Sequence, residues 1–316
     1  MDVNRATELA LPVMSTDRMT SGVADGELSG DTTSQERYHA WRSRQKFPAE
    51  YLLPHIMRQI QRRNPPAFMQ QVRGHLGLSM PELQNKVREL NPWLLPFHMR
   101  GDFDTMDTRS AQTAEKASRI QFRSDLIVGT AIELLGGDVA ETDVLDIGCN
   151  DGFFSLDVAH RGVRHVDGFD LRPTNIAKAR FLATHYGIGN VDFSVADVDD
   201  FEHEHQWDVV LNLGVLYHVV NPLQFMRQTY ELCRRFAIID TIVHSEPISA
   251  YVLFGDKNVD LPAEGREDWE LHPTYRGAID TIRYAGFSEV YEILGDADPP
   301  HELYARGNRR CFLAIR

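Results

Sequence analysis

Cysteine is scarce in this sequence, long apolar runs are missing, and basic residues are outnumbered by acidic ones. The three cysteines, Cys149, Cys233 and Cys311, form no CxxC pair, which excludes a disulfide framework and a zinc site of that type. No run approaches the roughly 18 apolar residues that a membrane span needs. The N-terminus also lacks the apolar segment of a secretory signal. We therefore expect a cytoplasmic protein without a membrane partner.

The shortage of basic residues bears on the choice of partner. Lys and Arg number 33 against 46 Asp and Glu, which gives a formal net charge of -13. Nucleic-acid binding rests largely on contacts of Lys and Arg with phosphates. Nucleic acid is therefore a disfavoured partner, although a local basic patch such as Arg58, Arg62 and Arg63 can occur on an acidic protein. We expect a small-molecule substrate, and the sequence leaves homo-oligomerisation open.

The N-terminal third differs in composition from the rest of the chain. Residues 1–34 are rich in Ser, Thr, Gly and Asp without an apolar period, which predicts a flexible tail. Residues 35–113 predict a helical layer and a connecting loop, with one helix capped by Ser79 and carrying Pro81 in its first turn. This layer is interpreted either as simple packing on the main domain or as a cap over a substrate site.

From residue 114 onward, short apolar runs alternate with helical segments after a first helix, Ala114–Leu135. Such alternation is typical of βαβ units and predicts an α/β fold with a doubly wound, mostly parallel sheet. Carboxyl ends of parallel strands meet at one edge of the sheet, where open α/β folds bind ligands. The predicted strands are 144–147, 166–169, 191–195, 209–213, 237–242, 289–293 and 311–315, and the predicted helices are 155–160, 176–185, 225–233 and 275–284.

The most informative segment is VLDIGCNDGFFS, residues 144–155, in which a strand runs through a glycine turn into a helix. Gly148 permits the tight turn, and Gly152 permits close approach of a ligand. Asp170 follows the second predicted strand, where a carboxylate can bind the two hydroxyls of a ribose. Asp197 follows the third strand. The segment therefore predicts a nucleoside-containing ligand.

DIGCNDG (residues 146–152) and NLGVLYH (residues 212–218) resemble the cofactor motifs of class I S-adenosylmethionine-dependent methyltransferases. The resemblance implies a seven-stranded Rossmann-like sheet and S-adenosyl-L-methionine as cofactor. It also implies that Gly148 faces the aminoacyl end, that Asp170 holds the ribose and that Asp197 contacts the adenine. The cofactor-binding residues predicted in this way are Asp146, Gly148, Asn150, Gly152, Phe153, Asp170, Leu171, Asp197, Val198, Asn212 and Leu213.

A dinucleotide oxidoreductase is the structural competitor, because its fingerprint also follows a first strand. That fingerprint is G-x-G-x-x-G, packed closely around a pyrophosphate. Here the loop reads Gly-Cys-Asn-Asp-Gly, with the acid Asp151 where a pyrophosphate would sit. A cationic sulfonium suits this acidic loop better than a diphosphate does. The sequence thus favours the methyltransferase, and a catalytically silent cofactor-binding module is the remaining alternative.

The segment NLGVLYHVVNPL, residues 212–223, is similar to the subgroup that contains the tRNA wobble-uridine carboxymethyl-transferring enzymes. That subgroup also includes enzymes that act on small molecules. Its members with a carboxylated cofactor use a Tyr in this motif and an Arg before the last strand, which Tyr217 and Arg310 match. We predict methyl transfer to an oxygen or nitrogen of a small molecule, and tRNA wobble-uridine modification is the alternative.

The predicted catalytic residues are Tyr217, His218 and His244, which follow strand ends at the ligand-binding edge. A neutral His can remove a proton from a hydroxyl or amine, while the plainer interpretation is that these side chains only line the pocket. No metal is expected, since the Glu202–His205 cluster lacks helical ligand spacing. The long aromatic loop Tyr251–Trp269 is predicted to cover the site together with residues 51–113.

Overall fold

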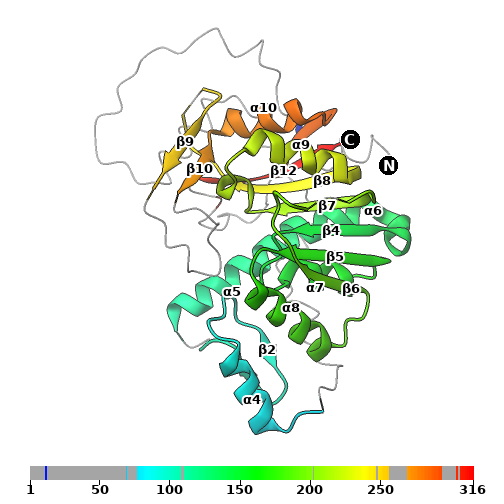
Figure 1. The fold of residues 1–316 in the computed structure, drawn as a ribbon, viewed down its shortest axis with the longest axis vertical. Coiled ribbons are helices and arrows are strands. Elements are labelled where there is room, and N and C mark those ends of the chain that lie inside the picture. The colour runs from blue at the N-terminus through cyan, green and yellow to red at the C-terminus, as the bar shows by residue number, and fades with distance from the viewer. Residues whose placement is uncertain are drawn as a thin grey trace.

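The computed structural model describes residues 11–12, 69, 77–107, 110–201, 203–246, 248–255, 269–293, 304 and 307–316. Its central feature is a sheet of seven main strands in the order β11-β12-β8-β7-β4-β5-β6 (Figure 1). The pairs β7–β8, β4–β7, β4–β5 and β5–β6 are parallel, and β12 is antiparallel to both of its neighbours. This arrangement confirms the predicted doubly wound, mostly parallel sheet. The strands are β4 (Asp143–Ile147), β5 (His165–Asp170), β6 (Val191–Val195), β7 (Trp207–Leu213), β8 (Cys233–Ile242), β11 (Glu289–Ile293) and β12 (Arg309–Ile315).

The helices of the main domain follow the strands closely, as the alternating pattern predicts. The segment from α5 to α6 contains one π-helical stretch, η3, and ends at Gly136, whose φ of 55° closes the helix. Proline occupies the first turn of α8 and of α9, where its missing N–H is tolerated. The elements are α5 (Ala111–Ser124), η3 (Asp125–Gly129), α6 (Thr130–Leu135), η4 (Gly136–Glu141), α7 (Phe153–His160), α8 (Pro173–Tyr186), η5 (Leu216–His218), α9 (Pro222–Leu232) and α10 (Tyr275–Ala285).

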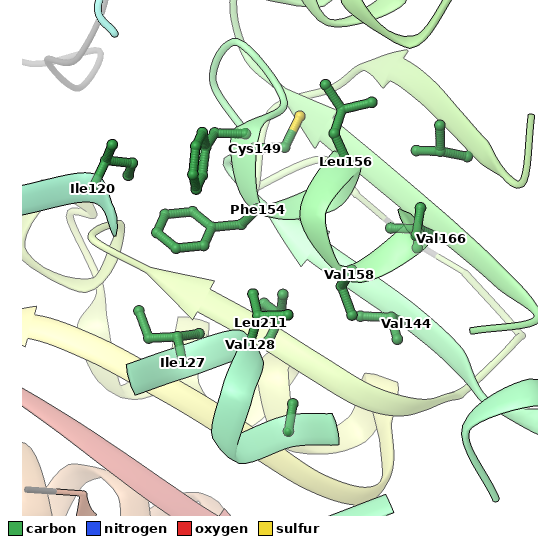
Figure 2. Close-up of a cluster of buried hydrophobic side chains, with 14 of the residues drawn as sticks. Ile120, Ile127, Val128, Val144, Cys149, Phe154, Leu156, Val158, Val166 and Leu211 are labelled. Atoms are coloured by element: carbon green, nitrogen blue, oxygen red, sulfur yellow. The ribbon is translucent and has the colours of Figure 1, made fainter. Parts of the chain in front are cut away.

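The two faces of the sheet bury two separate apolar cores. Side chains alternate along a strand, so in β4 Val144 contacts one core while Leu145 contacts the other. Figure 2 shows the first core, where Ile120 and Ile127 approach Phe154 and Leu211. The second core packs β-strand residues against α9 and α10, which lie beside each other in Figure 1. Helices on both faces leave the carboxyl ends of the parallel strands as the place for a site.

The described part of the N-terminal layer contains α4 (Met80–Glu89) and a small hairpin of β2 (His98–Met99) and β3 (Phe103–Asp104). Ser79 and Glu82 form a capping box at the start of α4, as the predicted cap requires. The layer attaches to the main domain through Trp93 and Lys178. The indole Nε1 of Trp93 donates to the Val87 carbonyl at 2.8 Å, and the Lys178 ammonium lies 5.7 Å from the indole ring. A buried cation–π contact therefore joins the layer to α8.

Two segments differ from the expectation. The predicted loop 251–269 begins with a strand, β9 (Tyr251–Phe254), which pairs with β10 (Glu270–Pro273) directly after the predicted loop. Within the predicted tail, β1 (Leu11–Pro12) pairs with β11. Both segments are strands because they pair with another strand, and the residue pattern of one segment alone does not reveal such pairing. The basic patch Arg58–Arg63 and most of residues 35–76 lie outside the described residues.

No helix within the described ranges is long and apolar enough to cross a membrane.

Trp93→Ala is expected to lower the free energy of unfolding by about 3–5 kcal/mol, because it removes a buried indole and leaves a cavity beside Lys178. Urea unfolding of the full chain measures this, with Gln84→Ala on the exposed face of α4 as the control. Equal midpoints and slopes for Trp93→Ala and Gln84→Ala would show that the layer is not held by this contact.

Candidate active site

A cavity of about 330 Å³ lies at the carboxyl ends of β4, β5 and β7. All of the predicted cofactor residues line it except Gly152 and Asn212, and the predicted catalytic residues Tyr217 and His218 line it as well. Leu94 and Leu95 of the N-terminal layer complete one wall. The sequence pattern therefore located one real cavity, built from both parts of the chain.

The glycine-containing loop between β4 and α7 is held in an unusual backbone conformation. Gly148 and Gly152 have φ of +66° and +84°, and Asn150 has a positive φ of 52°, which few residues other than Gly and Asn adopt. A Cβ on Gly152 would lie 2.8 Å from the Cβ of Ala179. Gly152 thus serves packing of the loop against α8, whereas Gly148 and Asn150 line the cavity.

Asn212 lies in β7 and is fully buried away from the cavity lining. Its side-chain Nδ2 donates to the Thr229 hydroxyl of α9 at 3.2 Å. The structure places the neighbouring Leu213 at the cavity instead, because successive residues of a strand face opposite sides.

Asp170, at the end of β5, organises the loop around it. Its Oδ2 accepts a hydrogen bond from the Asn150 backbone N–H at 3.0 Å, and its Oδ1 accepts from the Arg172 backbone N–H at 2.9 Å and the Asn175 side chain at 3.0 Å. Burial raises the pKa of Asp170, while these hydrogen bonds act in the opposite direction. The carboxylate is therefore fixed in position before any ligand arrives.

Asp146 and Asp151 are two further buried acids in the cavity wall. Burial raises the pKa of each to about 7, although the Ser155 hydroxyl donates to Asp146 at 2.5 Å and the Lys178 ammonium favours the charged form of Asp151. The Oδ2 atom of Asp151 is buried without a hydrogen-bond partner. This wall can stabilise a positive charge on a ligand, since ionisation of each acid then becomes less costly.

Another part of the cavity wall carries a cluster of buried charges that the sequence motifs did not indicate. Asp240, at the end of β8, is fully buried and accepts from the Arg309 Nε at 2.6 Å, the Arg123 Nη2 at 2.7 Å and the Tyr304 hydroxyl at 2.5 Å. Burial would raise the pKa of Asp240, but the guanidinium groups of Arg123 and Arg309 hold it below its usual value. Two arginines share one acid, so the wall carries a net positive charge.

Arg309, and not the neighbouring Arg310 that the resemblance indicated, lines the cavity. The Arg309 guanidinium lies 6.0 Å from the Tyr217 ring, and a Cβ on Gly214 would lie 2.9 Å from its Nη2. Arg310 projects from the other face of β12, where its Nε lies 3.1 Å from the Glu292 Oε1. Arg310 therefore does not line the cavity, because neighbouring residues of a strand face opposite sides.

The predicted catalytic residues occupy two different places. Tyr217 and His218 lie in the short helix η5 at the cavity, with ring centroids 4.2 Å apart. The His218 Nδ1 lies 3.3 Å from the Oε1 of the buried Glu270. His244 does not line the cavity; its backbone N–H donates to the Pro273 carbonyl at 2.8 Å behind the β9–β10 hairpin. The geometry thus groups His218, and not His244, with the cofactor residues.

One set of described side chains could approach a metal ion, and it lies elsewhere. The candidate ligand atoms of His165, Asp167 and Asp192 are within 4.8 Å of one another, near the beginnings of β5 and β6. The cavity lies at the other end of β5. In the Glu202–His205 cluster, for which no metal was expected, Glu202 lies outside the described residues and His203 is exposed.

Comparisons with known proteins bear on this geometry. Residues 138–271 match the model of a family described as a methyltransferase domain. The chain is 33% identical over 152 residues to the ubiquinone biosynthesis O-methyltransferase of Ruegeria pomeroyi, covering 46% of this chain and 60% of that protein. It is 26% identical over 203 residues to the tRNA U34 carboxymethyltransferase of Alteromonas mediterranea, covering 61% and 55%. The chain thus matches less than two thirds of the length of these relatives.

Among solved structures, the N-terminal domain of EvdMO1 with SAH bound is similar in fold, with a TM-score of 0.57 at 20% identity, covering 75% of this chain and 96% of that one. Together with the family match, these comparisons confirm the predicted relationship to class I S-adenosylmethionine-dependent methyltransferases and indicate S-adenosylmethionine as the cofactor. They leave the acceptor open, since the relatives named above act on different classes of molecule.

The raised pKa of Asp146 predicts a pH-dependent stability. A carboxyl with a folded-state pKa of about 7 against 3.8 stabilises the fold below pH 4, and this contribution is lost as the pH rises through 7. Asp146→Asn keeps an acceptor for Ser155 and removes the titration. Between about pH 5 and pH 8 the wild type should therefore lose on the order of 2 kcal/mol more unfolding free energy than the variant. If the unfolding free energies of the wild type and of Asp146→Asn, measured by denaturant titration, change equally with pH, the raised pKa of Asp146 is contradicted.

Proposed function

We propose, from the methyltransferase domain in residues 138–271, that this protein transfers a methyl group from S-adenosylmethionine to an oxygen or nitrogen of a small molecule. The observation that carries the proposal is the cavity itself. It unites the fixed Asp170 carboxylate, the acidic wall around Asp146 and the Tyr217–His218 pair in one space. The proposal covers the activity of the whole protein and the class of its acceptor.

The residues present fit the proposed cofactor by the chemistry of their side chains. The buried Asp146 and Asp151 favour a ligand with positive charge, whereas a diphosphate beside them would make their ionisation still more costly. When bound, S-adenosylmethionine supplies a methyl group made electrophilic by its sulfonium. The acidic wall of this cavity therefore favours the sulfonium cofactor over a dinucleotide.

Residues at the carboxyl ends of β5 and β6 bind the nucleoside part of the proposed cofactor. Asp170 uses three acceptor positions for the loop, and a carboxylate has about four, so room remains for a ribose hydroxyl. Leu171 and Val198 line the cavity beside it and offer apolar surface to an adenine ring. Asp197 lines the same region and accepts from the Asp199 backbone N–H at 3.1 Å. These groups bind and orient the cofactor without taking part in the chemistry.

Orientation of the acceptor falls to the opposite side of the cavity. Tyr217 and His218 project there from η5, and Leu94 and Leu95 approach from the N-terminal layer. Methyl transfer gains most from holding the reacting atoms in line and from excluding water. The N-terminal layer and the β9–β10 hairpin are the segments that we assign as the cover of this site.

A small-molecule acceptor fits the charge of the chain better than an RNA does. The net charge is -13, and the cavity holds five acids next to its four arginines. An RNA backbone would meet this surface with little compensation. A small acceptor requires only local complementarity, which the Tyr217–His218 side of the cavity supplies.

One observation favours a second candidate, the transfer of a carboxymethyl group to tRNA. Arg309 lies beside Tyr217, and the Nε of the neighbouring Arg123 is buried without a hydrogen-bond partner. Guanidinium donors of this kind suit a carboxylate. A carboxylated cofactor would place its extra charge against this wall, in line with the relative named tRNA U34 carboxymethyltransferase.

Asp170→Ala should weaken binding of S-adenosylhomocysteine by about 10- to 150-fold, because one hydrogen bond to a charged acceptor, worth about 1.5–3 kcal/mol, is lost. Isothermal titration calorimetry on the full chain measures the affinity. Asp192→Ala, which removes an exposed acid on β6, is the matched control and should bind as the wild type does. An unchanged affinity in Asp170→Ala would refute the assignment of this carboxylate.

Incubation with methyl-labelled S-adenosylmethionine tests the acceptor class. We expect label in the small-molecule fraction of a cell extract, and no label in purified bulk tRNA, because the acidic protein lacks compensation for phosphates. A parallel reaction with the carboxylated cofactor and tRNA serves as the comparison. Label that enters tRNA in either reaction would overturn the small-molecule proposal, and label from the carboxylated cofactor alone would establish the second candidate.

A further inference from the structure

We propose that Glu270 is a positioning residue for His218: its carboxylate engages Nδ1 of the imidazole and leaves Nε2 as the nitrogen that accepts a proton from a hydroxyl acceptor. The inference rests on the proposed methyl transfer and narrows its substrate class to acceptors whose nucleophilic atom carries a proton. The sequence motifs do not include Glu270, which lies directly after the segment 251–269 that was expected to be a loop.

The contacts of Glu270 are the first support. The residue is buried, at 3% exposure, and its two oxygens point to two different imidazoles. Its Oε1 lies 3.3 Å from the Nδ1 of His218, and its Oε2 lies 2.6 Å from the Nε2 of His272. A carboxylate in such a place favours a proton on the nitrogens that face it.

The backbone fixes this arrangement. Glu270 and His272 are two residues apart in β10 and therefore lie on the same face of the strand. β10 is paired with β9 along its length, and the Thr274 hydroxyl at its end caps α10 by accepting from the Gly277 N–H at 2.9 Å. A paired strand that leads directly into a capped helix holds a side chain more rigidly than a free loop does.

The position of His218 is the second support. Its ring lines the cavity, and its Nδ1 lies 3.3 Å from the Oε1 of Glu270. A neutral imidazole that carries its proton on Nδ1 has a basic Nε2. In the proposed step the acceptor O–H bond breaks, its electron pair stays on the oxygen, and the proton binds Nε2 of His218. Glu270 remains ionised, forms no bond, and stabilises the imidazolium that results.

Several other groups face this pair and set the sign of the titration. His272 shares Glu270 from the same strand, Tyr217 lies against His218 with ring centroids 4.2 Å apart, and the Arg309 guanidinium stacks on Tyr217 from β12. The Arg309 guanidinium disfavours a positive charge on His218, and the Glu270 carboxylate favours it. Removal of the Glu270 charge should therefore lower the titration midpoint of His218.

The test is a pH titration of the histidine side chains by ¹H–¹⁵N NMR in the full ¹⁵N-histidine-labelled protein, with His218→Gln to assign the resonance. In Glu270→Gln the His218 midpoint should fall by about one pH unit or more, and its preference for the Nδ1–H tautomer should be lost. Glu231→Gln, an exposed change on α9, is the matched control and should leave both unchanged. Coincident midpoints and tautomers in Glu270→Gln and wild type would overturn the proposal.

Two further variants keep the test decisive. Glu270→Asp retains the charge and should restore most of the midpoint, which a purely structural role of Glu270 would not predict. His272→Gln leaves the carboxylate to His218 and should raise its midpoint, so this variant tests the proposal if Glu270→Gln does not fold. A fall or no change in His272→Gln would contradict it. Calorimetry with S-adenosylhomocysteine on the same samples separates the proposed function from the role of Glu270. If the wild type does not bind S-adenosylhomocysteine, the proposed function is refuted, while the titration still tests the contact between Glu270 and His218.

Discussion

The hydrogen bonds of the Asp170 carboxylate are the interaction on which the rest of the site depends. They join the end of β5 to the backbone of Asn150 in the preceding loop and to the first turn of α8. The left-handed conformations of Gly148 and Asn150 are stable only in a loop that is tied down in this way. A single buried acid therefore shapes the cavity and also offers its remaining acceptor capacity to a ligand.

Around this fixed point the cavity has walls of opposite charge. Asp146 and Asp151 form an acidic side whose pKa values are raised by burial, and Arg123 and Arg309 form a basic side around Asp240. A ligand that is cationic at its centre and carries a carboxylate at one end satisfies both walls. We propose that this polarity orients the cofactor with its reactive end toward Tyr217 and His218, which line the same cavity.

The motifs predicted the sheet and most of one wall because those residues are contiguous in the chain. Asp146, Gly148 and Asn150 belong to one strand and turn, so a local pattern was sufficient. The basic wall was not predictable in this way, since Arg123 and Arg309 lie 117 and 69 positions from their common partner Asp240. A motif match does not separate Arg309 from Arg310, because one residue of register in β12 reverses the face on which a side chain lies. Glu270 was missed because the β9–β10 hairpin depends on pairing between distant segments.

The central claim is that this cavity binds S-adenosylmethionine. Mass spectrometry of the small molecules released from the purified native protein by denaturation tests it most directly. The account predicts S-adenosylmethionine or S-adenosylhomocysteine in the released fraction, and their loss from protein that carries Asp170→Ala. Release of a nicotinamide or flavin dinucleotide in place of these compounds would contradict it.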